Sequence, residues 1–224
     1  MKSERLAEYI DHTLLKPTAT PEQIIKLCAE AKEYHFKTVC VNPDWVTLAA
    51  RELKKSGVGI TTVVGFPLGV NTPETKAFEA REALENGATE IDMVINLGRL
   101  RSGDIKSVRE DIQTVKKACG QRILKVILET CLLSDQEIVA ACQLVMEAGA
   151  DFVKTSTGLS SGGATSHAVG LMRKTVGHNF GVKASGDVRS REDAEAIIKA
   201  GANRIGTSSG VAIVTGDEVI KGDY

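Results

Sequence analysis

Short apolar runs alternate along the chain with longer segments typical of helices. The runs are only a few residues long, are rich in Val, Ile and Thr, and carry few polar positions. This is the pattern of parallel strands that are buried on both faces. We therefore predict eight strands, at residues 10–14, 38–41, 60–64, 90–95, 123–128, 152–155, 181–184 and 204–207.

A helical segment follows each predicted strand, and a short helix precedes the first one. Two of these helices carry clear start signals. Thr20 stands before Pro21, a pairing typical of an N-cap followed by proline at the first helical position. Ser134 has Glu137 three residues on, which is the spacing of a capping box. The predicted helices span residues 21–34, 43–55, 72–86, 104–118, 134–147, 165–176 and 190–199, and a last short one begins near Ser208.

Eight strand–helix units over this length predict a closed (β/α)8 TIM barrel formed by one domain, residues 1–224. The alternative is an open, doubly wound sheet. That fold usually places G-x-G-x-x-G after its first strand, and this chain has no such motif there.

A faint repeat marks three of the junctions between helix and strand. Gly87, Gly149 and Gly201 each follow a predicted helix and precede a strand, a position that favours the left-handed conformation of glycine. Counting five residues on from each glycine reaches Asp92, Lys154 and Gly206. Equal geometry at the three junctions predicts that these residues lie at similar heights in the barrel.

Composition narrows the class of protein. The chain has 28 Lys and Arg against 29 Asp and Glu, so its charge gives no support for nucleic acid or an anionic membrane as a partner. Its five cysteines form no C-x-x-C pair, which favours reduced thiols in the cytoplasm over a disulfide framework. Its four histidines show no metal-binding spacing, and we find no signal peptide or membrane span. We expect a cytoplasmic protein without a metal or another cofactor.

Three lysines occupy predicted buried strands. Side chains alternate along a strand, so Lys154, Lys183 and Lys125 are expected to point into the barrel together with Asp92 and Glu129. A single lysine of this kind is as well explained by a rim position with its ammonium group in water. Three in successive strands are not, because a core selected for stability alone would not collect like charges.

Such a cluster suits an amine that acts as a nucleophile. With an ordinary pKa of about 10.4, roughly 4 in 10⁴ lysine amines are neutral at pH 7, and each unit of lowering raises that fraction about tenfold. Burial and a nearby ammonium group both lower the pKa of a lysine. We predict that Lys154 forms a covalent bond with a carbonyl substrate, that Lys183 is the nearby cation and that Asp92 carries protons.

Small, hydroxyl-rich and glycine-rich segments follow three of the predicted strands. They are Thr157-Gly158, Ser185-Gly186 and the run from Gly206 to Gly210. Each alone is an ordinary turn. Together, beside the lysines, they favour a phosphate site, because backbone N–H groups and a helix N-terminus can approach an anion there and barrels commonly bind phosphate after strands seven and eight.

Six motifs, in this order along nearly the whole chain, resemble those of the deoxyribose-phosphate aldolase family. They are residues 10–17 (IDHTLLKP), 90–94 (EIDMV), 124–130 (LKVILET), 152–158 (FVKTSTG), 182–186 (VKASG) and 206–209 (GTSS). The resemblance implies a metal-independent class I aldolase that reversibly cleaves 2-deoxy-D-ribose 5-phosphate to D-glyceraldehyde 3-phosphate and acetaldehyde. It also implies a homo-oligomer, a dimer or larger.

The resemblance also assigns roles by position. Lys154 matches the Schiff-base lysine, Lys183 the lysine that lowers its pKa, and Asp92 the proton donor and acceptor. The positions that line the substrate pocket are Asp11, Thr13, Cys40 and Lys125. The phosphate loops, to which Thr157 also belongs by its place after the strand, contribute Gly158, Gly186, Ser208 and Ser209.

Two positions leave questions open. Asp187 stands where the family usually has a second glycine, so its carboxylate either points to solvent or weakens phosphate binding. Tyr224 ends the chain either as a frayed tail or as a phenol brought near the pocket. Two other functions stay open as well. One is a Schiff-base barrel with a different donor, such as a transaldolase-like or keto-acid aldolase, and the other is a catalytically silent barrel that binds sugar phosphates.

Overall fold

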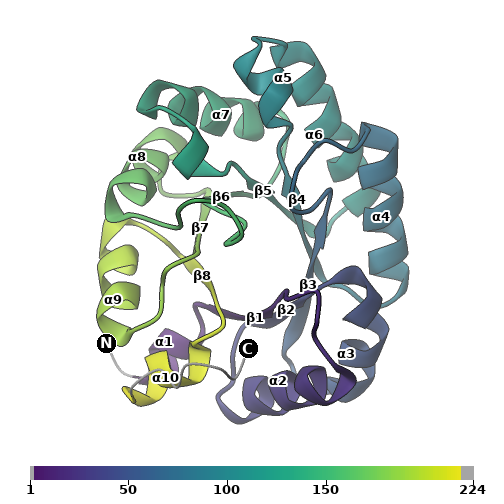
Figure 1. Cartoon of the computed structure of the whole chain (residues 1–224), viewed down its shortest axis with the longest axis vertical. Helices are drawn as coiled ribbons and strands as arrows, with labels where there is room; N and C mark the ends of the chain where they lie inside the picture. Colours follow the sequence, from purple (N-terminus) through teal and green to yellow (C-terminus); the bar gives the residue numbers. More distant parts are fainter. Residues whose placement is uncertain (1–2, 218–224) are drawn as a thin grey trace.

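Eight parallel strands close into a barrel in the computed structural model, which describes residues 3–217 (Figure 1). Neighbours in the sequence are neighbours in the barrel, and the last strand pairs with the first. The (β/α)8 fold predicted from the sequence is confirmed. The strands are β1 (Ile10–Leu14), β2 (Thr38–Val41), β3 (Gly59–Val64), β4 (Glu90–Val94), β5 (Ile123–Ile127), β6 (Phe152–Lys154), β7 (Gly181–Ser185) and β8 (Arg204–Thr207).

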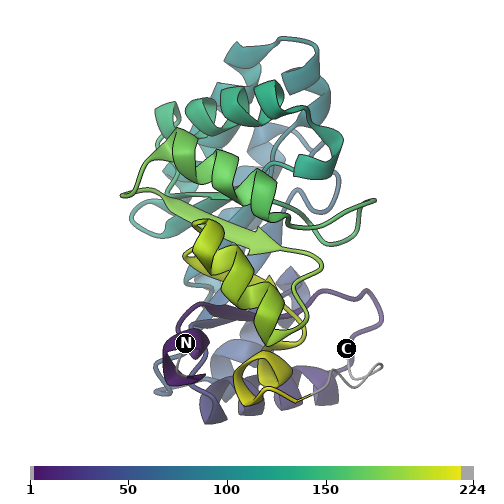
Figure 2. The ribbon, with the colours of Figure 1, turned by 90° about the vertical axis from the view of Figure 1, so that its left-hand side faces the viewer.

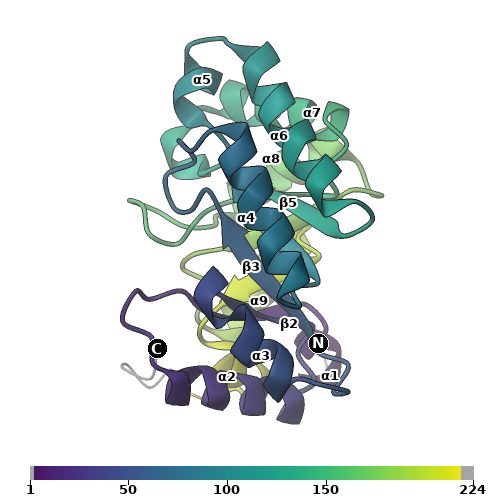
Figure 3. The same cartoon turned by 90° about the vertical axis from the view of Figure 1, so that its right-hand side faces the viewer.

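The helices form the outer layer around this ring. Figure 2 looks onto the side covered by α8 and α9, and Figure 3 onto the side where α4 and α6 lie next to each other. The α-helices are α1 (Ser3–Ala7), α2 (Pro21–Glu33), α3 (Val46–Glu52), α4 (Pro73–Glu85), α5 (Leu97–Arg101), α6 (Ile105–Cys119), α7 (Asp135–Glu147), α8 (Ser166–Val176), α9 (Arg191–Ala200) and α10 (Gly210–Thr215). Two 3₁₀ turns, η1 (Pro43–Trp45) and η2 (Thr130–Leu132), complete the elements.

The predicted start signals form as expected. Thr20 and Ser134 each accept a hydrogen bond from the backbone N–H three residues on, and both capping boxes are complete. Gly87, Gly149 and Gly201 all have positive φ, between 81° and 121°, in the turns that lead into β4, β6 and β8. These turns show that local sequence sets where the helices begin and where the chain turns back into the barrel.

The structure differs from the predicted helices in two places. The segment predicted as one helix from 43 to 55 divides into η1 and α3. The helix α3 ends early because the Ser56 hydroxyl donates a hydrogen bond to the carbonyl of Leu53 in a turn. The helix α5 was not predicted at all. Asn96 caps it by accepting from the N–H of Arg99, and only Leu100 of this short helix is buried. Such a short element has too few apolar positions to reveal a period.

Apolar side chains fill the space between the strands and the helices. Ile91, Val126, Val153, Val182 and Ile205 occupy the outward positions of their strands and are fully buried there. Alternation then turns the charged residues of the same strands toward the barrel axis. No helix in the range 3–217 is long and apolar enough to cross a membrane.

Candidate active site

Three lysines meet one carboxylate inside the barrel. Asp92, on β4, is fully buried, and its Oδ2 accepts from Lys154 Nζ and from Lys183 Nζ, each at 2.8 Å. Its Oδ1 accepts from Lys125 Nζ, also at 2.8 Å. The strand register explains the meeting, because Asp92 pairs with Lys125 across β4 and β5 while Lys154 pairs with Lys183 across β6 and β7. The sequence predicted these four residues together, and the structure places them in direct contact.

A second set of charges surrounds the first. Asp11 lies between Lys183 and Arg204, with its two oxygens at 2.5 Å and 2.8 Å from their nitrogens. Glu90 lies between Lys125 at 2.6 Å and Arg204 at 2.9 Å. These contacts join seven buried side chains from six strands into one network. We expect such a network to be rigid, because each carboxylate is held by at least two cations.

The network separates the properties of its two neighbouring lysines. Burial lowers the pKa of Lys154, and the ammonium group of Lys183 lowers it further, although Asp92 opposes both. The pKa of Lys183 is raised instead, since Asp11 and Asp92 together outweigh its burial. Burial opposes ionisation of Asp92, but three lysines hold its pKa well below the ordinary value. Of the two lysines, Lys154 is thus the one that gives up its proton more easily, beside an ionised carboxylate and a charged ammonium group.

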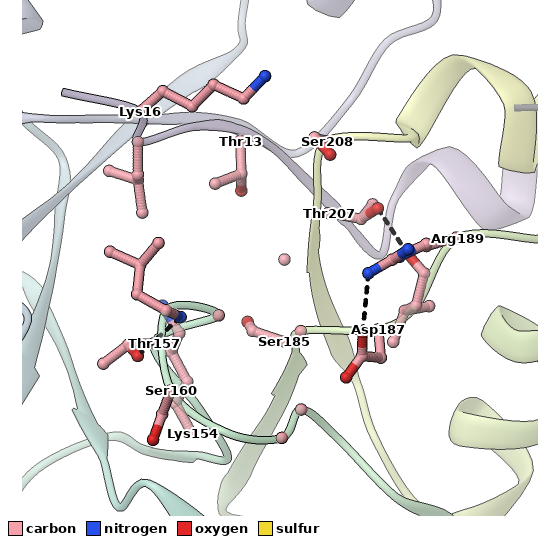
Figure 4. A pocket seen from close by; sticks show the side chains of 18 of the residues that line it. Thr13, Lys16, Lys154, Thr157, Ser160, Ser185, Asp187, Arg189, Thr207 and Ser208 are labelled. Carbon is pink, nitrogen blue, oxygen red and sulfur yellow. Dashed lines mark hydrogen bonds and ion pairs between the residues drawn. The ribbon is translucent and has the colours of Figure 1, made fainter. Parts of the chain in front are cut away.

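A cavity of about 450 Å³ opens above Lys154 at the carboxyl ends of the strands. Figure 4 shows Lys154 facing it together with residues from the loops after β6, β7 and β8. Four of the five predicted phosphate residues line the cavity, namely Thr157, Gly158, Gly186 and Ser208. Ser209 is not among the described residues that line it, and its N–H donates to Thr207 instead.

Two loops that line this cavity pack backbone against backbone. Gly163, in the loop after β6, lies so close to Gly186 that an added Cβ would come within 2.4 Å of the Gly186 carbonyl carbon. The N–H of Ala164 donates to the Gly186 carbonyl at 3.0 Å. The need for glycine at position 163 could not be predicted from its local sequence, because it arises from contact with the loop after β7. Only glycine allows the two loops to approach this closely.

Glu129 holds the start of the loop after β6. The prediction that it joins the lysines is wrong. Its carboxylate accepts from the Thr157 hydroxyl at 2.5 Å and from the Thr157 N–H at 3.2 Å. The reason is local: β5 ends at Ile127, and Glu129 has φ of 54°, so strand alternation no longer sets its direction. Both donors of Thr157 therefore point to Glu129.

Asp187 sits at the edge of the cavity in a left-handed backbone conformation, with φ of 60°. Aspartate adopts this region more readily than most residues, so the chain accommodates it where glycine is usual. Its carboxylate pairs with Arg189, with Oδ1 2.9 Å from a guanidinium nitrogen (Figure 4). Both side chains are mostly exposed. Arg189 also lines the cavity, and the sequence analysis did not single it out.

The remaining predicted pocket residues differ in whether they reach the cavity. Thr13 lines the cavity, and its hydroxyl donates to the carbonyl of Asp11. Cys40 pairs with Thr13 across β1 and β2 but is buried and is not among the residues that line the cavity, and burial raises the pKa of its thiol. Arg204 and Glu90 were not predicted as site residues, although alternation along β8 and β4 also turns them inward.

Tyr224 falls outside the described residues. No group of three or more metal-ligating side chains occurs in residues 3–217.

Comparison with known proteins gives one consistent family. Residues 5–216 match the sequence profile of the DeoC/LacD family aldolase. The deoxyribose-phosphate aldolase of Streptococcus gordonii is 63% identical over 220 residues, 98% of this chain and 100% of that protein. That of Brevibacillus brevis is 61% identical over 217 residues, 97% of this chain and 98% of that protein.

Solved structures agree with the sequence relatives. The structure described as the unique tetrameric structure of deoxyribose phosphate aldolase from Aeropyrum pernix superposes with a TM-score of 0.89 at 37% identity, covering 96% of this chain and 91% of that one. A structure named QR15, an aldolase, superposes with a TM-score of 0.91 at 40% identity, covering 94% and 95%.

Proposed function

The chain belongs to the DeoC/LacD family of aldolases, and from this we propose that it reversibly cleaves 2-deoxy-D-ribose 5-phosphate to D-glyceraldehyde 3-phosphate and acetaldehyde. We further propose that the reaction passes through a Schiff base on Lys154. One observation carries the mechanism: Lys154 is a buried amine with a lowered pKa at the base of a cavity, in contact with an ionised carboxylate.

The first step is attack of the neutral Lys154 amine on the aldehyde carbon of the open-chain sugar. A C–N bond forms, the carbonyl oxygen leaves as water with one proton from the amine and one taken up from solvent, and the product is a protonated imine. The positive imine then withdraws electrons from the bond between the second and third carbons of the sugar. Because the pKa of Lys154 is lowered, a larger fraction of this amine is neutral and able to attack than for an ordinary lysine.

Cleavage of the carbon–carbon bond requires a base. The hydroxyl on the third carbon gives up its proton to Asp92, directly or through a water molecule, and that carbon becomes the aldehyde of glyceraldehyde 3-phosphate. The electron pair of the broken bond forms an enamine on Lys154. The enamine takes back a proton at its methylene carbon, and hydrolysis of the imine releases acetaldehyde. Synthesis follows the same steps in reverse.

The other charged groups prepare these steps. Lys183 stays protonated and shares Asp92 Oδ2 with Lys154, so it favours the neutral form of the amine. Lys125 holds the second oxygen of Asp92 and fixes the orientation of the carboxylate. Asp11 holds Lys183 from the other side. Fixed charges of this kind stabilise developing charge without reorganising during the reaction.

The phosphate of the substrate is expected at the outer end of the cavity. Gly158, Gly186 and Ser208 lie on its lining and can offer backbone N–H groups and a hydroxyl, and Lys16 and Arg189 bring positive charge. Thr157 supports this site from behind, because both of its donors are taken by Glu129. We retain Ser209 as a weaker candidate, since it follows Ser208 at the start of α10.

Retro-aldol turnover tests the proposed function. Purified protein is given 2-deoxy-D-ribose 5-phosphate, and glyceraldehyde 3-phosphate is followed through a coupled dehydrogenase. We expect turnover that is unaffected by a metal chelator. Absence of turnover would favour a silent sugar-phosphate-binding barrel, and turnover only with a keto donor would indicate a different Schiff-base aldolase.

A related structure and exposed apolar side chains bear on the assembly state. We propose that the protein forms a homo-oligomer, because the Aeropyrum pernix relative is described as tetrameric. Large apolar side chains such as Phe78 on α4 and Leu68 before it are exposed on the single chain. Light scattering coupled to gel filtration tests this, and a monomer at micromolar concentration would contradict it.

A further inference from the structure

Charge in the buried network is unbalanced by one. Within residues 3–217, the ion pairs join four cations to three carboxylates. One positive charge therefore lacks a full partner inside the barrel. Since an uncompensated buried charge is costly, the network favours release of one proton from one of its cations.

The contacts identify the cation that releases it. Lys183 touches two carboxylates, Asp11 and Asp92, and Lys125 also touches two, Glu90 and Asp92. Lys154 touches Asp92 alone, and it shares that oxygen with Lys183. Lys154 is thus the least compensated lysine. The fourth cation is an arginine, which does not lose its proton in proteins.

Arg204 creates the imbalance. Its guanidinium group bridges Asp11 Oδ1 at 2.8 Å and Glu90 Oε2 at 2.9 Å, and it stacks 5.5 Å from the centre of the Phe152 ring. Within residues 3–217, its ion pairs are with these two carboxylates and not with Lys154, and it is not among the residues that line the cavity. Its effect must pass through the two carboxylates, which would otherwise be free to compensate Lys183 and Lys125 more fully.

We propose that Arg204 is a positioning residue for the lysine chemistry: its permanent charge occupies Asp11 and Glu90 and leaves Lys154 as the cation that sheds its proton. The inference rests on the proposed Schiff-base function and deepens it. Glu90 has the opposite effect, because its negative charge reduces the excess of positive charge in the network.

Besides Lys154, the buried inward-facing groups that carry a charge or can titrate come from six strands. Their charges are all part of the balance. They are Asp11 on β1, Cys40 on β2, Glu90 and Asp92 on β4, Lys125 on β5, Lys183 on β7 and Arg204 on β8. The β3 strand contributes Thr61, whose hydroxyl lies 3.4 Å from Glu90. Arg204 and Glu90 make their ion pairs with other residues, so each can be changed in charge without removing an ion pair of Lys154 or Asp92.

The test measures how the reaction of Lys154 with acetaldehyde depends on pH. Imine formation is trapped with cyanoborohydride between pH 5 and 10, and the adduct on Lys154 is quantified by mass spectrometry. For Arg204→Gln, we expect the half-maximal pH to rise by about one unit, the order of shift for removing one partly screened charge. For Glu90→Gln, we expect it to fall. Arg204→Lys keeps the charge and should stay close to the parent protein.

A matched control separates this effect from a change of net charge. Arg109→Gln removes a guanidinium group from the outer face of α6, where it pairs with Glu147, and should leave the half-maximal pH unchanged. Shifts of opposite sign for Arg204→Gln and Glu90→Gln support the proposal. An unshifted profile, or shifts in the same direction, overturns it. If Arg204→Gln does not fold, the other two variants test the proposal. It then requires a lower half-maximal pH for Glu90→Gln and an unchanged one for Arg204→Lys.

The adduct on the parent protein distinguishes the Schiff-base function from the role of Arg204. If the parent protein forms no adduct on Lys154, the Schiff-base function itself is wrong. If the parent protein forms the adduct and the Arg204 and Glu90 variants titrate like it, only the role of Arg204 is wrong.

Discussion

Replacing Asp92 with asparagine separates the two tasks of the buried carboxylate. The substitution keeps the shape of the side chain but leaves three lysines without their shared negative charge. We expect imine formation on Lys154 to persist, because losing a carboxylate favours the neutral amine. Carbon–carbon cleavage should slow by about 10²- to 10⁴-fold, the usual contribution of a positioned general acid–base group.

The effect on stability follows from the distances. Each lysine nitrogen lies 2.8 Å from an Asp92 oxygen, which corresponds to about 6 kcal/mol of attraction at an effective dielectric constant of 20, before desolvation is subtracted. Breaking a buried ion pair typically lowers the free energy of unfolding by about 3–5 kcal/mol, and we expect a loss in this range at pH 7.

The loss of unfolding free energy caused by Asp92→Asn should become smaller as the pH rises. In the Asp92→Asn variant, Lys154 keeps its burial and the nearby ammonium group of Lys183 but loses the carboxylate that opposed them, so it loses its proton more easily in the folded state than in the unfolded state. The unfolded state then binds more protons, so stability rises with pH up to about 10.4, the ordinary lysine pKa. In the parent protein, the lowered pKa of Asp92 affects stability at acidic pH instead. Its stabilising contribution is complete above about pH 4 and disappears as the pH falls through the lowered pKa.

Urea unfolding at pH 7 and pH 9 and coupled retro-aldol kinetics measure the two effects. Asp111→Asn is the matched control, since Asp111 is a buried carboxylate 2.6 Å from Lys76 and lies outside the barrel. Burial outweighs that ion pair and raises the pKa of Asp111, so we expect a smaller loss of stability and an unchanged kcat. A kcat for Asp92→Asn within tenfold of the parent protein would refute the reasoning.

Three further substitutions test other parts of the site. Lys154→Met should abolish turnover and, because the buried amine has a lowered pKa, should raise the free energy of unfolding at pH 7 by about 1.4 kcal/mol per unit of lowering; equal thermal melts at pH 7 would contradict this. Glu129→Ala removes the support of Thr157 and should raise KM for 2-deoxyribose 5-phosphate about tenfold, with KM for 2-deoxyribose changed less than about twofold. An equal change for both sugars would show that Glu129 acts on the whole barrel. Asp187→Gly removes a negative charge from the cavity edge and releases Arg189, so KM for the phosphorylated sugar should fall about three- to tenfold. An unchanged KM would mean that this carboxylate stays turned to solvent when phosphate binds.

The barrel and the central lysines could be predicted from sequence because both depend on short-range patterns. Strand alternation alone turns Lys125, Lys154, Lys183 and Asp92 inward, and the structure brings them into contact. Alternation does not say which inward residues meet. Arg204 contacts Glu90 across 114 residues of sequence, and that contact depends on barrel closure.

The prediction failed where the strands ended. Glu129 was assigned by counting along β5, but its left-handed backbone turns it toward Thr157. Gly163 became necessary only when its loop packed on Gly186. Loops at the carboxyl ends of the strands are fixed by one another more than by their own sequence, and the phosphate end of the cavity is built from such loops.

Trapping the imine tests the central claim most directly. The protein is incubated with acetaldehyde and borohydride, digested, and the modified peptide is identified by mass spectrometry. A single adduct with the mass of an ethyl group on Lys154, matched by loss of activity, is the predicted result. An active enzyme that carries no adduct, or that carries it on Lys183 or Lys125, would contradict the assignment of Lys154 as the covalent amine.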